Sequence, residues 1–298
     1  MQNTSLQQDE ESEIPSRKGG DRELTFTQRD FNFIRELVFE KAGIVLSEVK
    51  QDMVYGRLSR RIRKLGFAKF SDYCELLKNG DEEELGIFIN AMTTNLTSFF
   101  RENHHFEYLG NNLLPHLFKT KQDRRVRIWS AGCSTGEEPY CLAMVVKETL
   151  PKHAQWDVKI LATDLDTNVL EHGRRGVYTA ERVAGIDKAR LKRWFRKGRG
   201  DHAGFVRIAP ELGELITFKQ LNLMQPWPMS GPFDIIFCRN VVIYFDKPTQ
   251  KILFDRYSDI LADDGHLFLG HSESMYKVSD RFELIGKTIY QNLNGKNN

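Results

Sequence analysis

The sequence predicts an α/β protein built on an open, mostly parallel sheet. An all-helical domain precedes the sheet, and a small antiparallel β-subdomain is inserted into it. Apolar residues recur at helical spacing up to about residue 95, and a strand, a glycine turn and a helix start lie between 126 and 140. Strands then alternate with helices except at about 176–217. The expected division is a tail at 1–22, a helical domain at 23–95 and an α/β domain at 96–298.

Composition limits the class of protein. The chain has 298 residues, 40% of them hydrophobic, and a formal net charge of +2, so it can bury a core and has no general charge bias toward a partner. Four cysteines without metal-ligand spacing favour a reducing compartment and predict no metal site: Cys74, Cys133, Cys141 and Cys238. The polar N-terminus and the lack of a long apolar run predict a cytoplasmic protein without direct membrane insertion.

The N-terminal third predicts a disordered tail followed by helices. Residues 1–22 are rich in Gln, Glu, Ser and Gly and contain few apolar side chains, among them Ile14, so we expect no packed structure there. Thr27 is the expected N-cap of the first helix. Later helices are expected at Phe70–Lys78, Glu82–Asn90 and Asn103–Phe118.

The segment Gln51–Leu65 predicts a helix with an apolar face and a basic face. Four cations recur at helical spacing on the basic face: Arg57, Arg60, Arg61 and Lys64. Like charges at this spacing repel by about 0.2–0.5 kcal/mol per pair, so the pattern indicates a docking face for an acidic partner. The partner could be nucleic acid, although the four cations have no aromatic residues between them and the whole chain is nearly neutral. An acidic protein helix fits equally well. A merely solvated face is the alternative.

The central motif runs from Val126 to Tyr140 and predicts a strand, a turn of small residues ending at Gly136, and a helix N-terminus. Such a turn lets a nucleotide approach the backbone, and the first helical N–H groups point at it. Glu137 and Glu138 would repel a phosphate there but would favour a cation. S-adenosylmethionine is a nucleoside with a sulfonium and an ammonium group and without phosphate, so it fits the motif.

The motif has three other interpretations. Gly132-x-Ser134-x-Gly136 matches a hydrolase nucleophile elbow with His271 as a partner, but that elbow normally follows several strands, and this is the first strong strand of its domain. A dinucleotide site would need Gly-x-Gly-x-x-Gly, which is absent here. A turn that binds nothing is the third.

Polar residues follow the later predicted strands where those strands end. Asp164 follows the strand Trp156–Ala162 and is placed to accept hydrogen bonds from ribose hydroxyls, although it could instead cap a helix, for which Asp166 is the better candidate. Asn222 and the pair Arg239-Asn240 end two further segments, the second of them the apolar strand Phe233–Cys238. Because parallel strands end at one edge of a sheet, we expect these side chains to converge there.

The inserted stretch predicts a hairpin. It contains a basic helix (Lys188–Lys197), a loop with Gly198, Gly200 and Gly204, and the short strands Phe205–Ile208 and Leu215–Phe218. The chain then returns to the alternating pattern, with a helix at Thr249–Leu261 and a last strand at Phe282–Gln291.

The sequence resembles the CheR family of chemotaxis receptor methyltransferases, protein-glutamate O-methyltransferases, from about residue 24 to its end. The resemblance is carried by the runs Thr-Thr-Asn-Leu-Thr-Ser-Phe-Phe-Arg-Glu (93–102), Ser-Thr-Gly-Glu-Glu-Pro-Tyr (134–140), Ala-Thr-Asp-Leu-Asp-Thr (162–167), Cys-Arg-Asn-Val-Val-Ile-Tyr-Phe-Asp (238–246) and Gly-His-Ser-Glu (270–273). It implies a class I S-adenosylmethionine-dependent methyltransferase (Rossmann-like) domain, which releases S-adenosylhomocysteine. The implied cofactor contacts are Asn95, Thr97, Arg101, Glu138, Asp164, Asn222, Leu223, Arg239 and Asn240.

The resemblance also implies the substrate, the carboxylates of glutamates in the cytoplasmic helical region of chemoreceptors. A carboxylate with a pKa of about 4.3 is already ionised and needs no general base, so the site mainly positions it. Arg101 could hold that carboxylate and Tyr244 could orient it. Some members of the family bind a receptor C-terminal peptide through the β-subdomain, and the loop with Gly198, Gly200 and Gly204 fits that group.

The sequence leaves two other functions open. A nucleic-acid methyltransferase could use the basic helix, but it would normally carry an Asn/Asp-Pro-Pro-aromatic run where Cys238-Arg-Asn-Val stands, so we expect no nucleic-acid partner. A non-catalytic protein could bind the nucleoside and act by docking. Methyl turnover on a receptor with and without its methylatable glutamates separates these functions.

Overall fold

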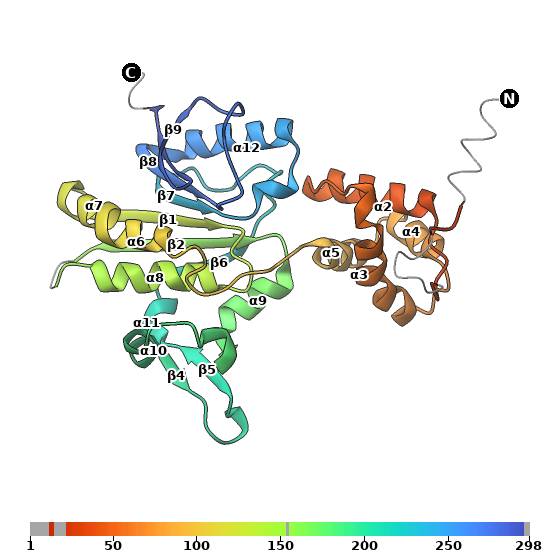
Figure 1. Cartoon of the computed structure of the whole chain (residues 1–298), viewed down its shortest axis with the longest axis horizontal. Coiled ribbons are helices and arrows are strands. Elements are labelled where there is room, and N and C mark those ends of the chain that lie inside the picture. The colour runs from red at the N-terminus through yellow and green to blue at the C-terminus, as the bar shows by residue number, and fades with distance from the viewer. Residues whose placement is uncertain (1–11, 15–21, 153–154, 295–298) are drawn as a thin grey trace. The chain divides into compact units, whose positions relative to one another are not determined.

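A computed structural model describes residues 12–14, 22–152 and 155–294. The chain divides into two compact units, residues 1–94 and 95–298, each described here by itself (Figure 1). Most of the predicted tail lies outside the described residues. Residues 12–14 contradict the expectation of disorder, because Ile14 is buried and its N–H donates to the Phe26 carbonyl at 2.9 Å.

The first unit is helical, as its periodicity predicts. Its elements are α2 (Gln28–Ala42), η1 (Glu48–Lys50), α3 (Gln51–Lys64), α4 (Phe70–Lys78) and α5 (Glu82–Met92). Thr27 caps α2 in a reciprocal capping box with Asp30, which confirms the predicted N-cap. The core contains fully buried Phe31, Val54 and Phe70 from three of the helices.

The second unit is organised by a seven-stranded sheet in the order β6-β2-β1-β7-β8-β10-β9. Its strands are β1 (Arg125–Ala131), β2 (Asp157–Asp164), β6 (Ile216–Gln220), β7 (Phe233–Cys238), β8 (Leu261–Leu269), β9 (Phe282–Gly286) and β10 (Ile289–Asn292). The first five strands in this order run parallel, and β10 and β9 pair antiparallel. The carboxyl ends of β6, β2, β1 and β7 therefore meet at one edge.

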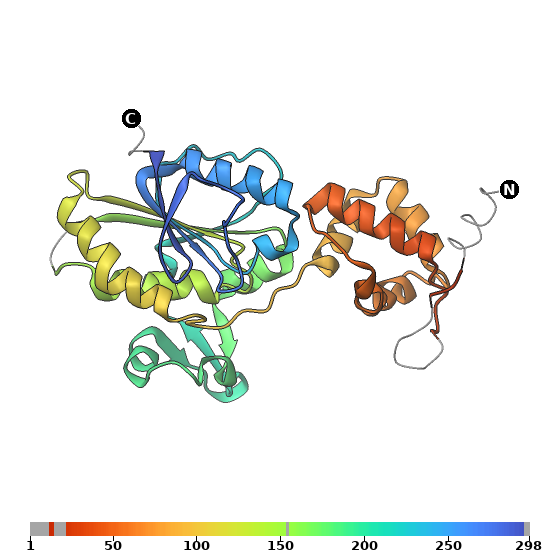
Figure 2. The same ribbon diagram turned by 45° about the horizontal axis from the view of Figure 1, so that its top comes forward.

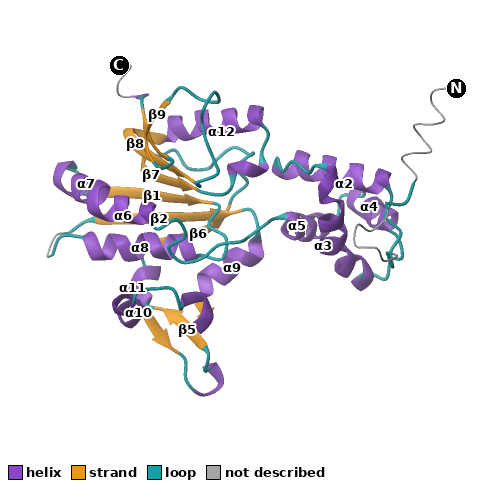
Figure 3. Cartoon of the chain, viewed as in Figure 1, coloured by secondary structure: helices purple, strands orange, loops and turns teal. Residues whose placement is uncertain are grey.

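Helices cover both faces of this sheet (Figures 2 and 3). They are α6 (His104–Tyr108), the π-helical turn η2 (Leu109–Leu113), α7 (Leu114–Thr120), α8 (Glu137–Thr149), α9 (Thr167–Arg175) and α12 (Lys247–Ile260). Successive side chains of a strand point to opposite faces of its sheet, and β1 shows both layers. Val126 and Ile128 pack with α8, while Trp129 and Ala131 pack with α12. None of the helices in the described part of the chain is long and apolar enough to cross a bilayer.

The β-subdomain differs from its prediction in one strand. Its sheet has the order β3-β5-β4, with β3 (Val177–Thr179), β4 (Phe195–Lys197) and β5 (Phe205–Ile208), and it also contains η3 (Ala180–Val183), α10 (Lys188–Trp194), η4 (Gly200–His202) and α11 (Pro210–Gly213). The predicted strand Leu215–Phe218 instead belongs to β6, which pairs with β2 and packs Phe218 against the main core. The predicted basic helix ends at Trp194, because Phe195 begins the edge strand of the subdomain.

The predicted last strand, Phe282–Gln291, was wrong as a single element. The structure turns back between β9 and β10, and Lys287 and Thr288 in that turn have positive φ angles of 47° and 61°. Two-residue hairpins of this kind normally use Asn or Gly. Their absence concealed the turn from sequence analysis.

Candidate functional site

The turn after β1 lies at the carboxyl edge of the sheet and is shaped by glycine. Gly132 and Gly136 have φ angles of 93° and 96°, which favour glycine, and a Cβ atom on Gly132 would collide with Val241. The N–H groups of Gly132 and Cys133 both donate to the Thr163 carbonyl at 2.8 Å. The turn is thus fixed to the end of β2, and Val241 fills the space that a side chain on Gly132 would need.

Asp164, at the end of β2, organises the turn. Its carboxylate accepts hydrogen bonds from the backbone N–H groups of Ser134 at 2.8 Å and Asp166 at 3.0 Å. Burial raises its pKa to about 6 despite these hydrogen bonds. Asp166 caps α9, accepting from the Asn168 N–H, so Asp166 and not Asp164 is the helix cap, as the sequence favoured.

The two acids at the start of α8 are each neutralised by an arginine that the motif alone did not reveal. Glu137 is fully buried, accepts from the Thr135 hydroxyl at 2.6 Å and pairs with Arg182. Glu138 accepts from the Ser130 hydroxyl at 2.7 Å and from Arg239 at 3.2 Å, while burial raises its pKa. The negative field toward a cationic ligand is therefore weaker than the sequence implied.

Arg239, at the end of β7, is turned into the protein. Its guanidinium pairs with Glu138 at 3.2 Å and with Glu102 at 3.4 Å, and it donates to the Arg101 carbonyl. It also lies over the Phe106 ring at 5.4 Å. The Arg239 Nε has no hydrogen-bond partner among the described residues. Arg239 thus ties together three segments of the site.

Glu273 was missed as an organising residue, although it ends a run that the resemblance used. Its buried carboxylate accepts backbone N–H bonds from Gly270 at 2.6 Å, Asn240 at 2.8 Å and Val241 at 2.8 Å. Burial raises its pKa even so. Asn240 has a left-handed φ of 59°, which this anchoring sustains. The only sequence signal was an acid two residues beyond a conspicuous Gly-His pair.

The segment after β6 holds two of the predicted cofactor contacts. The Asn222 side-chain oxygen accepts from the Met224 N–H at 2.9 Å, and the Leu223 carbonyl accepts from Arg256 at 2.6 Å. These bonds fix the backbone of the segment at the same sheet edge as Asp164.

The stretch before α6 carries the remaining predicted site residues. Asn95 donates to Asp166 at 2.7 Å, and its carbonyl accepts from the Ser134 hydroxyl at 2.9 Å, which joins it to the glycine turn. Thr97 is half-buried in the same stretch. Arg101 donates to the Leu96 carbonyl at 2.8 Å, and among the described residues no carboxylate pairs with it.

Tyr244 follows the pair Arg239-Asn240 along the chain, after β7. It ends the short 3₁₀ turn η5 (Val242–Tyr244) after β7 and is half-buried. The N–H of Ile243, in the same turn, donates to Glu273 at 3.3 Å. Glu273 therefore supports the segment that carries Tyr244.

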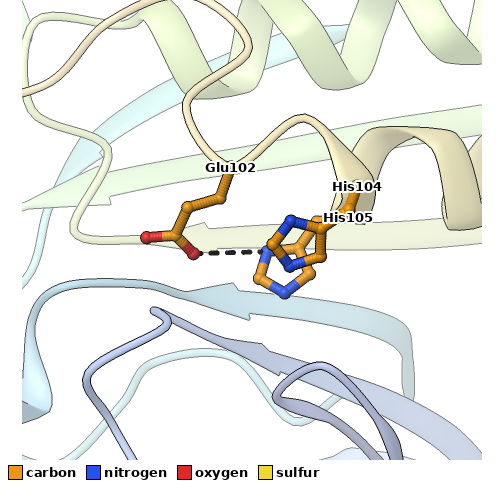
Figure 4. A group of neighbouring side chains, drawn as sticks. All are labelled: Glu102, His104 and His105. Atoms are coloured by element: carbon orange, nitrogen blue, oxygen red, sulfur yellow. Dashed lines mark ion pairs between the residues drawn. The ribbon is translucent and has the colours of Figure 1, made fainter.

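Glu102, His104 and His105 lie within ligand distance of one another (Figure 4). His105 is fully buried, and burial lowers its pKa to about 4, so it is neutral at pH 7. Its Nε2 lies 2.9 Å from the Lys287 carbonyl and therefore carries the proton. Glu102 already serves Arg239 and His271, and the nearby guanidinium disfavours a cation. Glu102 and His105 are thus held by separate partners, and the His105 Nδ1 has no hydrogen-bond partner among the described residues.

The predicted docking residues on α3 divide into two kinds. Arg57 donates to the carbonyls of Met92 at 2.6 Å and Thr93 at 2.7 Å, at the end of α5. Arg61 chelates the buried Glu84 carboxylate. These two cations thus have a structural role that the sequence did not predict, because their partners lie on another helix. Arg60 and Lys64 are exposed.

The predicted docking glycines lie in one loop. Gly198, Gly200 and Gly204 all belong to the connection between β4 and β5. Gly200 and Gly204 have left-handed φ angles of 57° and 87°. Their loop follows β4, a strand at the edge of its sheet.

Comparison with known proteins identifies the family of this chain. Residues 29–93 match the family described as CheR methyltransferase, all-alpha domain, and residues 95–291 match CheR methyltransferase, SAM binding domain. The chain is 43% identical over 270 residues to the chemotaxis protein methyltransferase of Escherichia coli, covering 90% of this chain and 92% of that protein. It is 43% identical over 277 residues to chemotaxis protein methyltransferase 2 of Pseudomonas aeruginosa, covering 93% and 97%. The chain belongs to the CheR methyltransferase family.

Proposed function

We propose that this protein transfers the methyl group of S-adenosylmethionine to glutamate carboxylates of chemotaxis receptors, forming glutamyl methyl esters and S-adenosylhomocysteine. The observation that carries the proposal is the match of both CheR domains, one after the other, along residues 29–291. The chain matches the two chemotaxis protein methyltransferases named above over nearly their whole length. A cytoplasmic enzyme acting on the cytoplasmic helices of receptors follows from this proposal.

The reaction asks little acid–base chemistry of the protein. The ionised glutamate oxygen attacks the methyl carbon, the C–O bond forms as the C–S bond breaks, and the sulfonium becomes a neutral sulfide, so no proton moves. Opposite charges merge in the transition state, and positioning is the main contribution of the site. In this proposal Asp164 accepts from the ribose hydroxyls, and Asn95, Thr97, Glu138, Asn222, Leu223, Arg239 and Asn240 complete the cofactor site.

Arg101 and Tyr244 are proposed to handle the substrate. Arg101 has a carbonyl as its hydrogen-bond partner and no paired carboxylate among the described residues, which leaves its charge available to an incoming glutamate. Tyr244 would donate a hydrogen bond to that carboxylate or orient it.

The test is methyl transfer from isotopically labelled S-adenosylmethionine to receptor cytoplasmic fragments, with the methyl group located by peptide mass mapping. We expect base-labile methyl esters on glutamates and no transfer to a fragment whose methylatable glutamates are replaced by alanine. Label on nucleic acid, offered in parallel, would support the nucleic-acid methyltransferase instead. Cofactor binding without transfer to either acceptor would support a docking protein.

We further propose that the exposed cations of α3 dock the receptor. Arg60 and Lys64 lie on the exposed face of this helix and suit an acidic helical partner. The variant Arg60→Glu with Lys64→Glu should lower receptor methylation most strongly below about 0.1 M salt, where charges act over roughly 10 Å or more. Lys50→Glu with Lys78→Glu makes the same charge change on exposed residues elsewhere in the unit and serves as the control. Equal methylation by the two double variants would leave this face merely solvated.

The β-subdomain is proposed to hold a receptor C-terminal peptide. Among the described residues β4 pairs with β5 and with no strand on its other side, so this edge can accept an extended peptide. A concave surface along it is lined almost entirely by cations and backbone: Lys192, Arg193, Phe195, Arg196, Lys197, Gly198 and Arg199. An acidic peptide with its terminal carboxylate fits this charge.

Calorimetric titration with receptor C-terminal peptides tests this site. We expect a Kd on the order of 1 μM, equivalent to about −8 kcal/mol. Arg193→Glu with Arg199→Glu, or deletion of residues 199–201, should abolish binding and leave cofactor affinity unchanged. Lys219→Glu, on the exposed edge of β6, is the control for reversing a single charge away from this surface. No heat with any receptor peptide would place this enzyme among the family members that act untethered.

A further inference from the structure

We propose that Glu102 is a positioning residue for methyl transfer, because its carboxylate clamps the turn that presents Arg101. This inference rests on the proposed function, in which Arg101 receives the substrate carboxylate. Glu102 itself does not bind the substrate in this proposal, because its carboxylate oxygens already bond to His271 and Arg239.

The backbone around Arg101 has an unusual conformation. Phe100 and Glu102, the residues on either side of it, have left-handed φ angles of 54° and 55°. Residues other than Gly, Asn and Asp rarely adopt this backbone conformation. It persists only where surrounding contacts impose it. These two left-handed residues on either side of Arg101 set the direction in which its side chain leaves the backbone.

Contacts from other elements hold the turn in place. The Phe100 N–H lies 3.1 Å from the Sγ of buried Cys141, in α8. The Arg101 N–H donates to the Ser98 carbonyl at 3.3 Å, and the Arg101 carbonyl accepts from Arg239. The peptide groups on both sides of the Arg101 Cα are therefore fixed.

The Glu102 carboxylate supplies the clamp. It accepts from the His271 N–H at 3.1 Å, lies 2.8 Å from His271 Nδ1 and pairs with Arg239 at 3.4 Å. The stretch before α6 is thereby tied to the ends of β7 and β8, and through Arg239 to Glu138 of α8. The Glu102 side chain is 10% exposed, whereas that of His271 is 66% exposed.

Burial acts to raise the pKa of Glu102, but the hydrogen bond from His271 and the charge of Arg239 outweigh it and lower the pKa to about 2. The clamp is therefore closed across the physiological pH range. The rate of methyl transfer falls when the arginine that binds the substrate carboxylate can adopt many positions. The contacts of Glu102 restrict Arg101 to one position.

The test is a double-mutant cycle between Glu102→Gln and Arg101→Ala. Glu102→Gln keeps the size of the side chain but presents an N–H to Arg239. It should lower kcat/KM for the receptor about 10-fold, leave the Kd for S-adenosylmethionine within about 2-fold, and have no further effect when Arg101 is already alanine. His271→Ala, at an exposed position that does not threaten the fold, should lower kcat/KM about 3-fold with the same dependence on Arg101. Glu107→Gln, an exposed acid of α6, is the matched control.

A second measurement does not require activity. Trypsin cleavage after Arg101 should be about 10-fold faster in Glu102→Gln than in the wild type, because the released turn can enter the protease. Faster cleavage together with an inactive wild type would overturn the proposed function and leave the clamp standing. Unchanged cleavage, or losses of kcat/KM that multiply with those of Arg101→Ala, would overturn the clamp.

Discussion

Two regions of the molecule use arginine–carboxylate clusters for different ends. In the helical unit, Arg61 of α3 chelates the buried Glu84, which also accepts from the Tyr73 hydroxyl at 2.8 Å. In the other unit, Arg239 joins Glu138 and Glu102 beneath the turn and loops at the carboxyl edge of the sheet. The first cluster closes a core, and the second joins the segments that carry the proposed cofactor and substrate residues. An arginine–carboxylate pair therefore does not identify a functional site by itself. The segments that the pair joins must also be known.

The largest expected effect is at the glycine turn of the second region. In Gly132→Ala, the new Cβ would collide with Val241 and the backbone would retain a φ of 93°, so the turn must shift. We expect cofactor affinity to fall by at least about 100-fold, or roughly 2.7 kcal/mol, because ligand approach depends on this backbone. Calorimetry measures it, and a Kd within a few-fold of the wild type would remove the turn from the site.

The next effect sharpens the role of the helical cluster. Arg61→Ala leaves the Glu84 charge buried with only Tyr73 beside it, and we expect a loss of about 2–4 kcal/mol in unfolding free energy. Arg60→Ala, one residue away and exposed, should change stability by no more than about 0.5 kcal/mol. Urea unfolding of both variants provides the comparison. Equal losses would show that the pair does not close the core.

A smaller effect concerns pH and the cofactor site. The pKa of Asp164 is raised to about 6, so its carboxylate is ionised above that pH and protonated below it. The hydrogen bonds that we propose Asp164 accepts from ribose hydroxyls should therefore be present well above pH 6 and be lost as the pH falls through 6. We expect the Kd for S-adenosylmethionine to rise about 10-fold between pH 7 and pH 5, and the dependence to flatten in Asp164→Asn. The same slope in both proteins would assign the titration to another group.

The smallest effect uses the matching glycine of the first region. Gly56 lies exposed in the middle of α3, and an added Cβ would meet nothing within 4 Å. Gly56→Ala should therefore stabilise the protein by about 0.5–1 kcal/mol, because alanine loses less backbone entropy in a helix. Cofactor affinity should not change. Destabilisation would mean that this face of α3 is not free.

Much of this arrangement was predictable from short-range patterns. Apolar spacing identified α4 over Phe70–Lys78 and β7 over Phe233–Cys238 with the bounds that the structure has. Parallel strands end together, so the polar residues that follow them were expected at one edge, and Asp164 and Arg239 do follow strands that end there. Local hydrogen-bonding chemistry identified Thr27 and Asp166 as caps.

The tertiary structure decided what each charged residue does. The sequence by itself determined that this chain folds as helices followed by a parallel sheet with its polar residues at one edge, because periodicity and strand direction are encoded locally. Only the folded chain placed Ile216–Gln220 in the main sheet, assigned Arg57 and Arg61 to α5, and joined Arg239 to Glu138 across 101 residues. Ion pairs and edge-strand pairings form between segments distant in sequence, and no local pattern specifies which distant partner a charge or a strand edge will meet.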